Sequence, residues 1–187
     1  GTGAFNGINN SSVGANGTLN LYDNSVYGNS NSGAAALNCI TIAPSTTATS
    51  NIYGNNIYNS STAGSTLNGL LISNGKINYI YKNNIYNLSS SVAASIVYGM
   101  NSTGGTNNYF YNNFISDLKA PLASNGTAIA GMYFSSGTSN VYAYNNTVYL
   151  NASSSSAFFG SAALYVVPSA TLIVKLKNNI LINNSTP

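Results

Sequence analysis

The sequence contains no histidine, no tryptophan and one cysteine, and only 4% of its residues are charged. Five lysines and two aspartates carry all of that charge, and arginine and glutamate are absent. These absences exclude a histidine–cysteine zinc site and a serine–histidine or cysteine–histidine nucleophile pair. The lone Cys39 allows no internal disulfide, and we interpret it as a small buried apolar residue.

The scarcity of charge also limits the partners of the chain. A formal net charge of +3 from scattered lysines is too weak for a nucleic-acid-binding surface. No apolar run approaches the ~20 residues that a membrane-spanning helix needs. The first residue is Gly1, from which we expect a processed or excised piece. A neutral surface of Asn, Ser, Thr, Gly and Tyr is typical of proteins outside the cell, so we expect an extracellular or cell-surface location.

What the sequence has instead is a repeat built on an asparagine doublet, as in Asn145-Asn146-Thr147-Val148. The spacing between the second residues of successive doublets ranges from 28 (Asn56 to Asn84) to 33 (Asn113 to Asn146). Internal repeats of about 20–50 residues indicate a solenoid or another repeat architecture. The six positions taken as markers are Asn24, Asn56, Asn84, Asn113, Asn146 and Asn179.

Alternating apolar residues on both sides of a Gly-, Ser- or Pro-rich turn predict short strands with one buried face in every period. The predicted buried column of the first strand is Ile8, Cys39, Leu70, Met100, Met132 and Leu164. In the second strand the residues three positions before each marker are predicted to point inward, namely Leu21, Tyr53, Tyr81, Phe110, Ala143 and Leu176. The next residues are predicted to face solvent, namely Tyr22, Gly54, Lys82, Tyr111, Tyr144 and Lys177.

Three short strands per period, without any helix-length segment, predict an all-β fold. We expect residues 1–187 to form one right-handed parallel β-helix (a β-solenoid) of about six coils. Asparagine side chains stacked at the turn between the second and third strands would hydrogen-bond from coil to coil as an Asn ladder. Asparagine also tolerates the left-handed backbone that a sharp corner demands. The predicted ladder consists of Asp23, Asn55, Asn83, Asn112, Asn145 and Asn178.

The doublets and their apolar flanks resemble the right-handed parallel β-helix superfamily that includes the pectin lyases. The segments Tyr144 to Leu150 and Lys177 to Asn183 look more narrowly like the long secreted bacterial surface proteins exported by the gliding-associated (type IX) route. The resemblance covers all six periods. It implies a β-helical fold and an exported protein, but superfolds host many activities.

Residues for catalysis are missing from the pattern. Glycoside hydrolysis needs two carboxylates about 5–10 Å apart, whereas Asp23 and Asp117 fall three coils apart, or about 14 Å at the usual strand spacing. The lyase relatives use acidic calcium ligands with an arginine or lysine base. Here Lys82, Lys175 and Lys177 are predicted to share a face without an acidic neighbour, as expected of solvated lysines that discourage strand pairing. We expect no metal, no cofactor and no enzymatic activity.

Two non-catalytic functions are compatible with such a chain. The first is a structural segment of a surface filament or long adhesin, because neither end carries a recognisable cap and bare coil edges can pair with another strand. The partner would then be a second copy, head to tail, or further coils of the same chain.

The alternative is a carbohydrate-binding module whose exposed tyrosines stack on the sugar rings of a surface polysaccharide. The residues predicted for this role are Tyr22, Tyr111 and Tyr144, with Tyr109 and Tyr142 on the same face. Tyrosine is also favoured in strands for packing reasons alone. A flat row of exposed tyrosines would favour sugar binding, and registered end coils would favour the filament.

Overall fold

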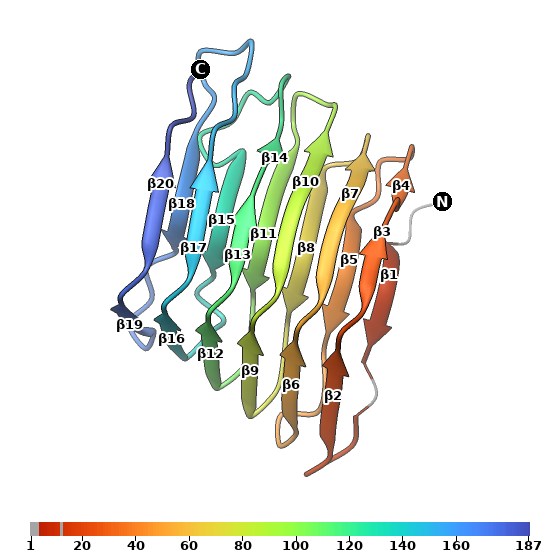
Figure 1. Cartoon of the computed structure of the whole chain (residues 1–187), viewed down its shortest axis with the longest axis vertical. Helices are drawn as coiled ribbons and strands as arrows, with labels where there is room; N and C mark the ends of the chain where they lie inside the picture. The colour runs from red at the N-terminus through yellow and green to blue at the C-terminus, as the bar shows by residue number, and fades with distance from the viewer. Residues whose placement is uncertain (1–3, 12) are drawn as a thin grey trace.

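The chain coils around one axis in a computed structural model that describes residues 4–11 and 13–187. All the regular structure in these residues is β-strand, arranged in three parallel sheets (Figure 1). The nearer strands in Figure 1 run upward, the farther ones run downward, and successive coils advance from right to left. That combination is a right-handed coil. The predicted six-coil parallel β-solenoid is confirmed.

Each coil contributes one strand to each sheet, and each strand pairs with its equivalents in the neighbouring coils. The first sheet consists of β1 (Phe5–Asn10), β5 (Leu37–Ile42), β8 (Thr66–Ile72), β11 (Ile96–Ser102), β15 (Ile129–Phe134) and β18 (Ser161–Val166). The second sheet consists of β2 (Thr18–Tyr22), β6 (Thr49–Tyr53), β9 (Ile77–Tyr81), β12 (Asn107–Tyr111), β16 (Asn140–Tyr144) and β19 (Ile173–Lys177).

The third sheet completes the coil. It consists of β3 (Ser25–Tyr27), β7 (Asn56–Thr62), β10 (Asn84–Ser90), β13 (Phe114–Ser116), β17 (Thr147–Leu150) and β20 (Ile180–Asn183). Two short strands, β4 (Ser30–Asn31) and β14 (Leu118–Lys119), extend it by pairing with β7 and β10.

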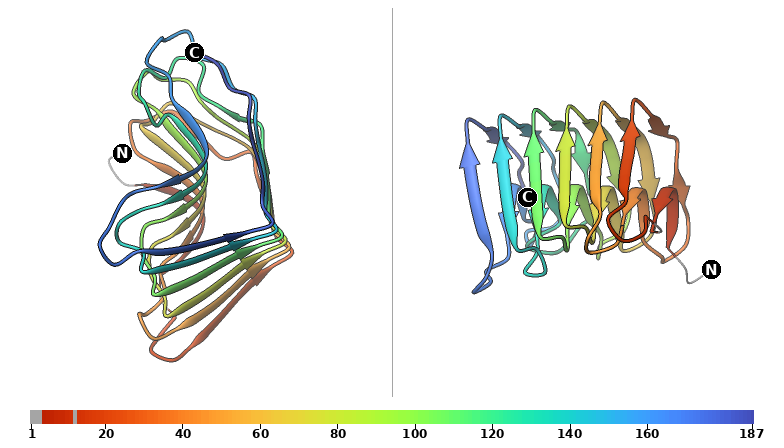
Figure 2. Two further views of the ribbon diagram at one scale, coloured as in Figure 1. Left: turned by 90° about the vertical axis from the view of Figure 1, so that its left-hand side faces the viewer. Right: turned by 90° about the horizontal axis from the view of Figure 1, so that it is seen from below.

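The corner between the second and third sheets is the most regular part of the coil. In the left view of Figure 2 this corner superposes from coil to coil, whereas the other connections spread apart. The link from the third sheet back to the first spans only 63–65 in the second coil but 151–160 in the fifth. The variation in period therefore falls largely in this loop, as the sequence indicated, while the corner fixes the register.

The interior is a set of aliphatic columns between the three sheets. Leu70, Met100 and Met132 lie in one column and are 0% exposed, as predicted. The member from the second coil is Ile40 rather than Cys39, because Ile40 pairs with Leu70 in the parallel register. Cys39 lies instead in the column of small residues, whose other members are Gly7, Gly69, Gly99, Gly131 and Ala163.

That small-residue column is required by a close approach of the first and third sheets. A Cβ atom placed on Gly131 would lie 2.3 Å from Cγ1 of Val148, and one on Gly99 would lie 2.5 Å from Cγ2 of Ile115. Such distances are shorter than any ordinary carbon–carbon contact. Glycine therefore recurs at this position because there is no room for a larger side chain between the two sheets.

The second sheet corrects two of the predicted inward positions. Ile52 and Ile80 are the buried residues of the second and third coils, both 0% exposed. Tyr53 and Tyr81, predicted to point inward, pair in register with Tyr22 and lie in the outward column. The prediction for these two coils was wrong by one residue, which exchanges the faces of a strand because side chains alternate with a period of two.

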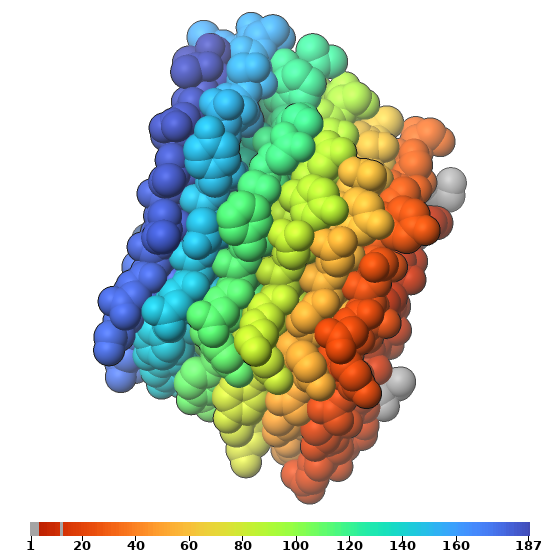
Figure 3. Space-filling model, viewed as in Figure 1, coloured from red at the N-terminus to blue at the C-terminus, as the bar shows by residue number. Residues whose placement is uncertain are grey.

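Both end coils leave part of their apolar surface uncovered among the described residues. In the sixth coil Leu176 is 49% exposed and Leu181 is 39% exposed. Their partners in the fifth coil, Ala143 and Val148, are fully buried. In the first coil the end of the interior is open as a cavity of about 280 Å³. Its lining comprises Gly7, Ile8, Asn24, Ser25, Val26, Tyr27 and Asn29. Between these ends the coils lie in direct contact, as Figure 3 shows for one face.

Candidate functional site

The corner between the second and third sheets carries the Asn ladder. In the fourth coil Asn113 is 2% exposed, and its Oδ1 accepts hydrogen bonds from the backbone N–H and from Nδ2 of Asn83, both at 3.0 Å. Its own Nδ2 donates to the carbonyl of Ile80 at 2.9 Å and to Oδ1 of Asn146 at 2.9 Å. The ladder runs unbroken through Asn24, Asn55, Asn83, Asn113, Asn146 and Asn179.

This membership corrects four of the six predicted ladder residues. Asn55 and Asn83 are confirmed. The other four predicted residues are exposed and make no ladder hydrogen bond with the described residues: Asp23, Asn112, Asn145 and Asn178. They occupy the preceding position, where the backbone is left-handed with φ near 55°. The residues in that corner column are Asp23, Gly54, Lys82, Asn112, Asn145 and Asn178, with φ between 54° and 65°.

A signal in the sequence could have located the ladder correctly. In each of the first five coils a tyrosine stands two residues before the ladder asparagine, as Tyr53 precedes Asn55 and Tyr111 precedes Asn113. The doublet gave a wrong prediction because its ladder residue changes position between coils. In the second and third coils the first asparagine of the doublet is the ladder residue, and in the later coils the second asparagine is. Aligning on tyrosine removes that ambiguity.

Tyrosines form stacked columns that the sequence analysis did not predict as stacks. On the outer face of the second sheet the rings of Tyr22, Tyr53, Tyr81 and Tyr111 stack, with centroids 4.7–5.0 Å apart. The other columns are Tyr79–Tyr109–Tyr142, Tyr27–Tyr58–Tyr86 and Tyr98–Tyr133–Tyr165. Parallel strands lie about 4.8 Å apart, so in-register tyrosines fall at stacking distance.

The three tyrosines predicted to bind sugar lie on one sheet but in different environments. Tyr22 ends its column and is 51% exposed, so one face of its ring is free of a stacking partner among the described residues. Tyr111 stacks on Tyr81. Tyr144 leaves the column and tilts by 53° against Tyr142. Within the stacks the ring faces cover one another, and sugar rings need an exposed face.

The tyrosine columns make stability sensitive to alkaline pH. Partial burial, followed by repulsion from neighbouring tyrosine phenolates, raises the pKa of Tyr98, Tyr109 and Tyr111 above the ordinary value of about 10. Because the unfolded chain releases these protons first, the stabilisation is complete below about pH 10 and declines above it. We expect a constant melting temperature from pH 7 to 8 and a pronounced fall above about pH 10, followed by circular dichroism.

The same experiment on Tyr98→Phe should show a shallower alkaline fall, because the removed phenol is the most strongly shifted one. An identical alkaline profile in wild type and Tyr98→Phe would contradict the stacked arrangement.

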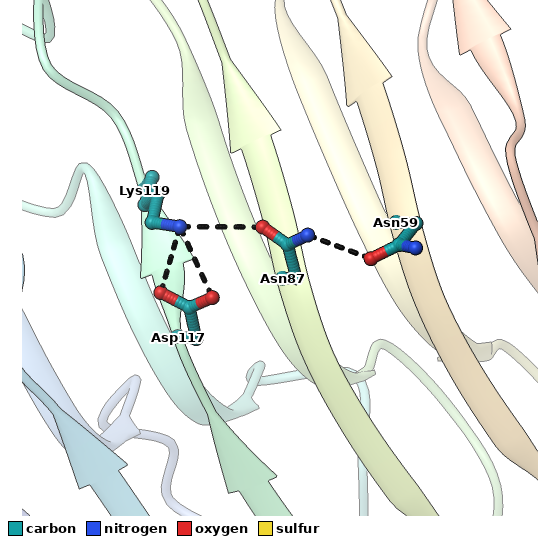
Figure 4. Close-up of polar contacts among 4 residues, drawn as sticks. All are labelled: Asn59, Asn87, Asp117 and Lys119. Carbon is teal, nitrogen blue, oxygen red and sulfur yellow. Dashed lines mark hydrogen bonds and ion pairs between the residues drawn. The ribbon is translucent and has the colours of Figure 1, made fainter.

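One charged cluster occurs on the third sheet. Nζ of Lys119 lies 2.9 Å from a carboxylate oxygen of Asp117 and donates to Oδ1 of Asn87 at 3.2 Å. Asn87 in turn donates to Asn59 (Figure 4). Asn59, Asn87 and Asp117 all have a left-handed backbone, with φ between 50° and 52°. These three residues therefore mark a shared bend in three successive coils.

The ion pair should contribute little to stability. Its side chains are 50% and 45% exposed, and exposed pairs contribute about 0.2–1 kcal/mol. We expect Lys119→Ala to lower the free energy of unfolding by less than about 1 kcal/mol in low salt, with a smaller effect in high salt. A loss above about 2 kcal/mol in chemical denaturation would show that the row stabilises the bend far more than its exposure implies.

A second polar row lies inside the solenoid. Ser50, Asn78 and Asn108 occupy one column of the second sheet and are 0% exposed. Nδ2 of Asn78 donates to Oδ1 of Asn108 at 2.7 Å and to the carbonyl of Asn74 at 3.0 Å. Oδ1 of Asn78 and Oγ of Ser50 have no partner among the described residues. Alternation alone could not reveal this row, because asparagine at an inward position reads as a surface residue.

The groups considered for catalysis do not converge. Asp23 lies at the corner of the first coil and Asp117 in the third sheet of the fourth, where Lys119 pairs with it. Lys175 lies over the ring of Tyr142, with Nζ 5.5 Å from the centroid. Lys175 and Lys177 share the outward face of β19, as predicted, but Lys82 belongs to the corner column.

The remaining reactive group is a buried thiol. Cys39 is 0% exposed, and burial raises the pKa of its thiol to about 11. The described residues hold no group of three or more His, Cys, Asp or Glu side chains placed to bind a metal ion. Within the same residues no helix is long and apolar enough to cross a membrane.

Comparison with known proteins adds no relative: no family model, no curated protein and no solved structure matches this chain.

Proposed function

We propose that this chain is a non-catalytic structural protein of the cell exterior, a rod-like segment of a surface filament or adhesin. The observation that carries the proposal is the ladder from Asn24 to Asn179, which joins all six coils without interruption. Every coil is also joined to the next by parallel strands in all three sheets. A rod held this way resists separation of its coils along the axis.

Composition and resemblance support the proposed extracellular location. A surface of neutral polar residues with 4% charge fits an extracellular setting, and the segment Tyr144 to Leu150 resembles the secreted bacterial β-helical proteins of the type IX route. The right-handed parallel architecture is the one found in the pectin-lyase-like superfamily. No chemistry is carried over from that superfamily, because its acidic calcium ligands have no counterpart in this sequence.

The test is immunogold electron microscopy of intact source cells with an antibody against this chain. We expect label on filaments or extended fibres at the outer surface, and only there. Label confined to the cell interior would refute the proposal. A parallel assay against soluble and insoluble polysaccharides should release no new chain ends, and release that saturates with substrate would show an enzyme.

Carbohydrate binding is the second candidate, favoured by the eight tyrosines on the outer face of the second sheet: Tyr22, Tyr53, Tyr79, Tyr81, Tyr109, Tyr111, Tyr142 and Tyr144. A glycan would bind where a ring face is free, at Tyr22 or at the tilted Tyr144. Co-sedimentation with insoluble polysaccharides tests this candidate. Tyr22→Ala and Tyr144→Ala should abolish binding, and Tyr86→Ala on the third sheet should preserve it; equal binding by all three variants would refute it.

A further inference from the structure

The edge of the sixth coil and the edge of the first have complementary hydrogen-bonding groups. At every step inside the solenoid, the N–H and Nδ2 of one ladder asparagine donate to Oδ1 of the next. Asn179 ends the ladder, and its N–H has no acceptor among the described residues, whereas Asn146 donates to Oδ1 of Asn179. Asn24 begins the ladder, and its Oδ1 accepts from no described donor.

The apolar columns are equally complementary. Leu164, Leu176 and Leu181 end the three inward columns in the sixth coil. The same columns begin in the first coil with Ile8, Leu21 and Val26. Aliphatic residues therefore face aliphatic residues in all three sheets if the edge of the sixth coil meets the edge of the first.

The shape and charge of the two edges agree with this pairing. The open cavity of about 280 Å³ in the first coil is lined partly by Ile8, Val26 and Asn24, so the half-exposed Leu181 would fill it. Lys177 ends the column that begins with Tyr22. It would lie over the free face of that ring, as Lys175 lies over Tyr142 within the chain. A cation over an aromatic face is attractive.

We propose that the edge of the sixth coil docks on the edge of the first coil of a second copy, in the register of the internal coils. Asn179 then donates through N–H and Nδ2 to Oδ1 of the next copy's ladder asparagine, Asn24, whose Nδ2 donates to the carbonyl of Leu176. The contact is heterologous, so repetition builds a linear filament. This inference rests on the proposed structural function and names its partner.

The first test is electron microscopy and sedimentation of the purified 187-residue chain across a concentration series. We expect linear filaments whose length grows with concentration. Leu181→Lys places a charge at the proposed junction and should leave folded monomers. Tyr149→Lys is the matched control, because Tyr149 has the same 39% exposure as Leu181 but lies on the side of the rod, and it should retain filaments. Equal assembly by the two variants would overturn the docking.

The second test fixes the register by cross-linking. Ser25 and Ile180 belong to one column of the third sheet and are both exposed. In the docked pair their Cα atoms would lie about 4.8 Å apart, within the range that a disulfide spans. Oxidised Ser25→Cys/Ile180→Cys should form covalent multimers. Ser25→Cys/Phe114→Cys should stay monomeric, because Phe114 lies in the same column but in the fourth coil.

The experiments distinguish failure of the docking proposal from failure of the proposed structural function. A chain that remains monomeric at all concentrations, with an intact β-sheet spectrum and no cross-linked multimers, overturns the docking but leaves surface labelling to decide the structural role. Docking is also overturned if further coils of the same polypeptide cover the sixth coil and abolish assembly. Filaments with surface label absent would uphold docking and refute the cellular function.

Discussion

Replacing Leu70 by aspartate is expected to unfold the solenoid or to leave only the coils on one side of the substitution folded. Leu70 is 0% exposed in the interior column between Ile40 and Met100. An unpaired carboxylate at that point loses its hydration without gaining a partner, at a cost of several kcal/mol. Met100→Asp should behave alike. Thermal and denaturant unfolding, followed by circular dichroism, measures the effect.

Leu71→Asp is the matched control, because Leu71 follows Leu70 in the same strand but is only partly buried. The control should lose markedly less stability than Leu70→Asp. Similar melting of wild type and Leu70→Asp would mean that the first sheet presents its other face to the interior.

Asn113→Ala is expected to lower the free energy of unfolding by about 3–5 kcal/mol. The substitution removes the two hydrogen bonds that Nδ2 of Asn113 donates, and the two that Oδ1 accepts from Asn83. The backbone N–H of Asn83 is then buried without an acceptor, and such a group costs about 1–3 kcal/mol beyond the lost bonds. Denaturant titration of the two proteins gives the difference directly.

Asn112→Gly is the informative companion to Asn113→Ala. Asn112 is exposed and has φ 56°, a left-handed conformation that glycine adopts without steric strain. We expect its stability to stay within about 1 kcal/mol of wild type. If Asn112→Gly were the damaging change and Asn113→Ala the tolerated one, the ladder would consist of the residues first predicted from the doublets.

The fold was predictable from the sequence because a solenoid repeats its local pattern. Six periods share an alternation of apolar residues and a loop of variable length. A parallel β-solenoid is the architecture that buries the apolar residues of every period in the same way. The existence of an Asn ladder was predictable for the same reason. An amide side chain stacked in register can hydrogen-bond to the equivalent residues in the coils above and below it. Asn55 and Asn83 were placed correctly. The other four predictions were each one residue early: Asp23, Asn112, Asn145 and Asn178.

The errors in the ladder and in the second sheet share one physical cause. The corner needs a left-handed residue followed by a ladder amide, and asparagine serves both purposes, so the doublet does not say which residue does which. In the second and third coils Gly54 and Lys82 take the left-handed position instead. Aligning all doublets on the second residue therefore shifted these two strands and exchanged Tyr53 and Tyr81 with Ile52 and Ile80.

The tyrosine columns escaped prediction through the same shift. Once aligned, Tyr22, Tyr53, Tyr81 and Tyr111 fall in register and stack. Their stacking also changes the expectation for sugar binding, because a ring whose faces are covered offers only its edge and hydroxyl. The free ring of Tyr22 then matters most as the surface on which Lys177 of a second copy would lie.

The distance between the first and last coils tests the central claim most directly. Spin labels at Tyr22→Cys and Lys177→Cys, with Cys39→Ala as background, should lie in one outward column separated by five coil steps. At about 4.8 Å per step the backbone separation is about 24 Å. Pulsed electron–electron double resonance on the labelled protein, diluted in unlabelled protein, should give one narrow distance distribution near that value. The only added length should come from the linkers of the two spin labels. A broad distribution, or a separation about twice as long, would contradict the stacked solenoid.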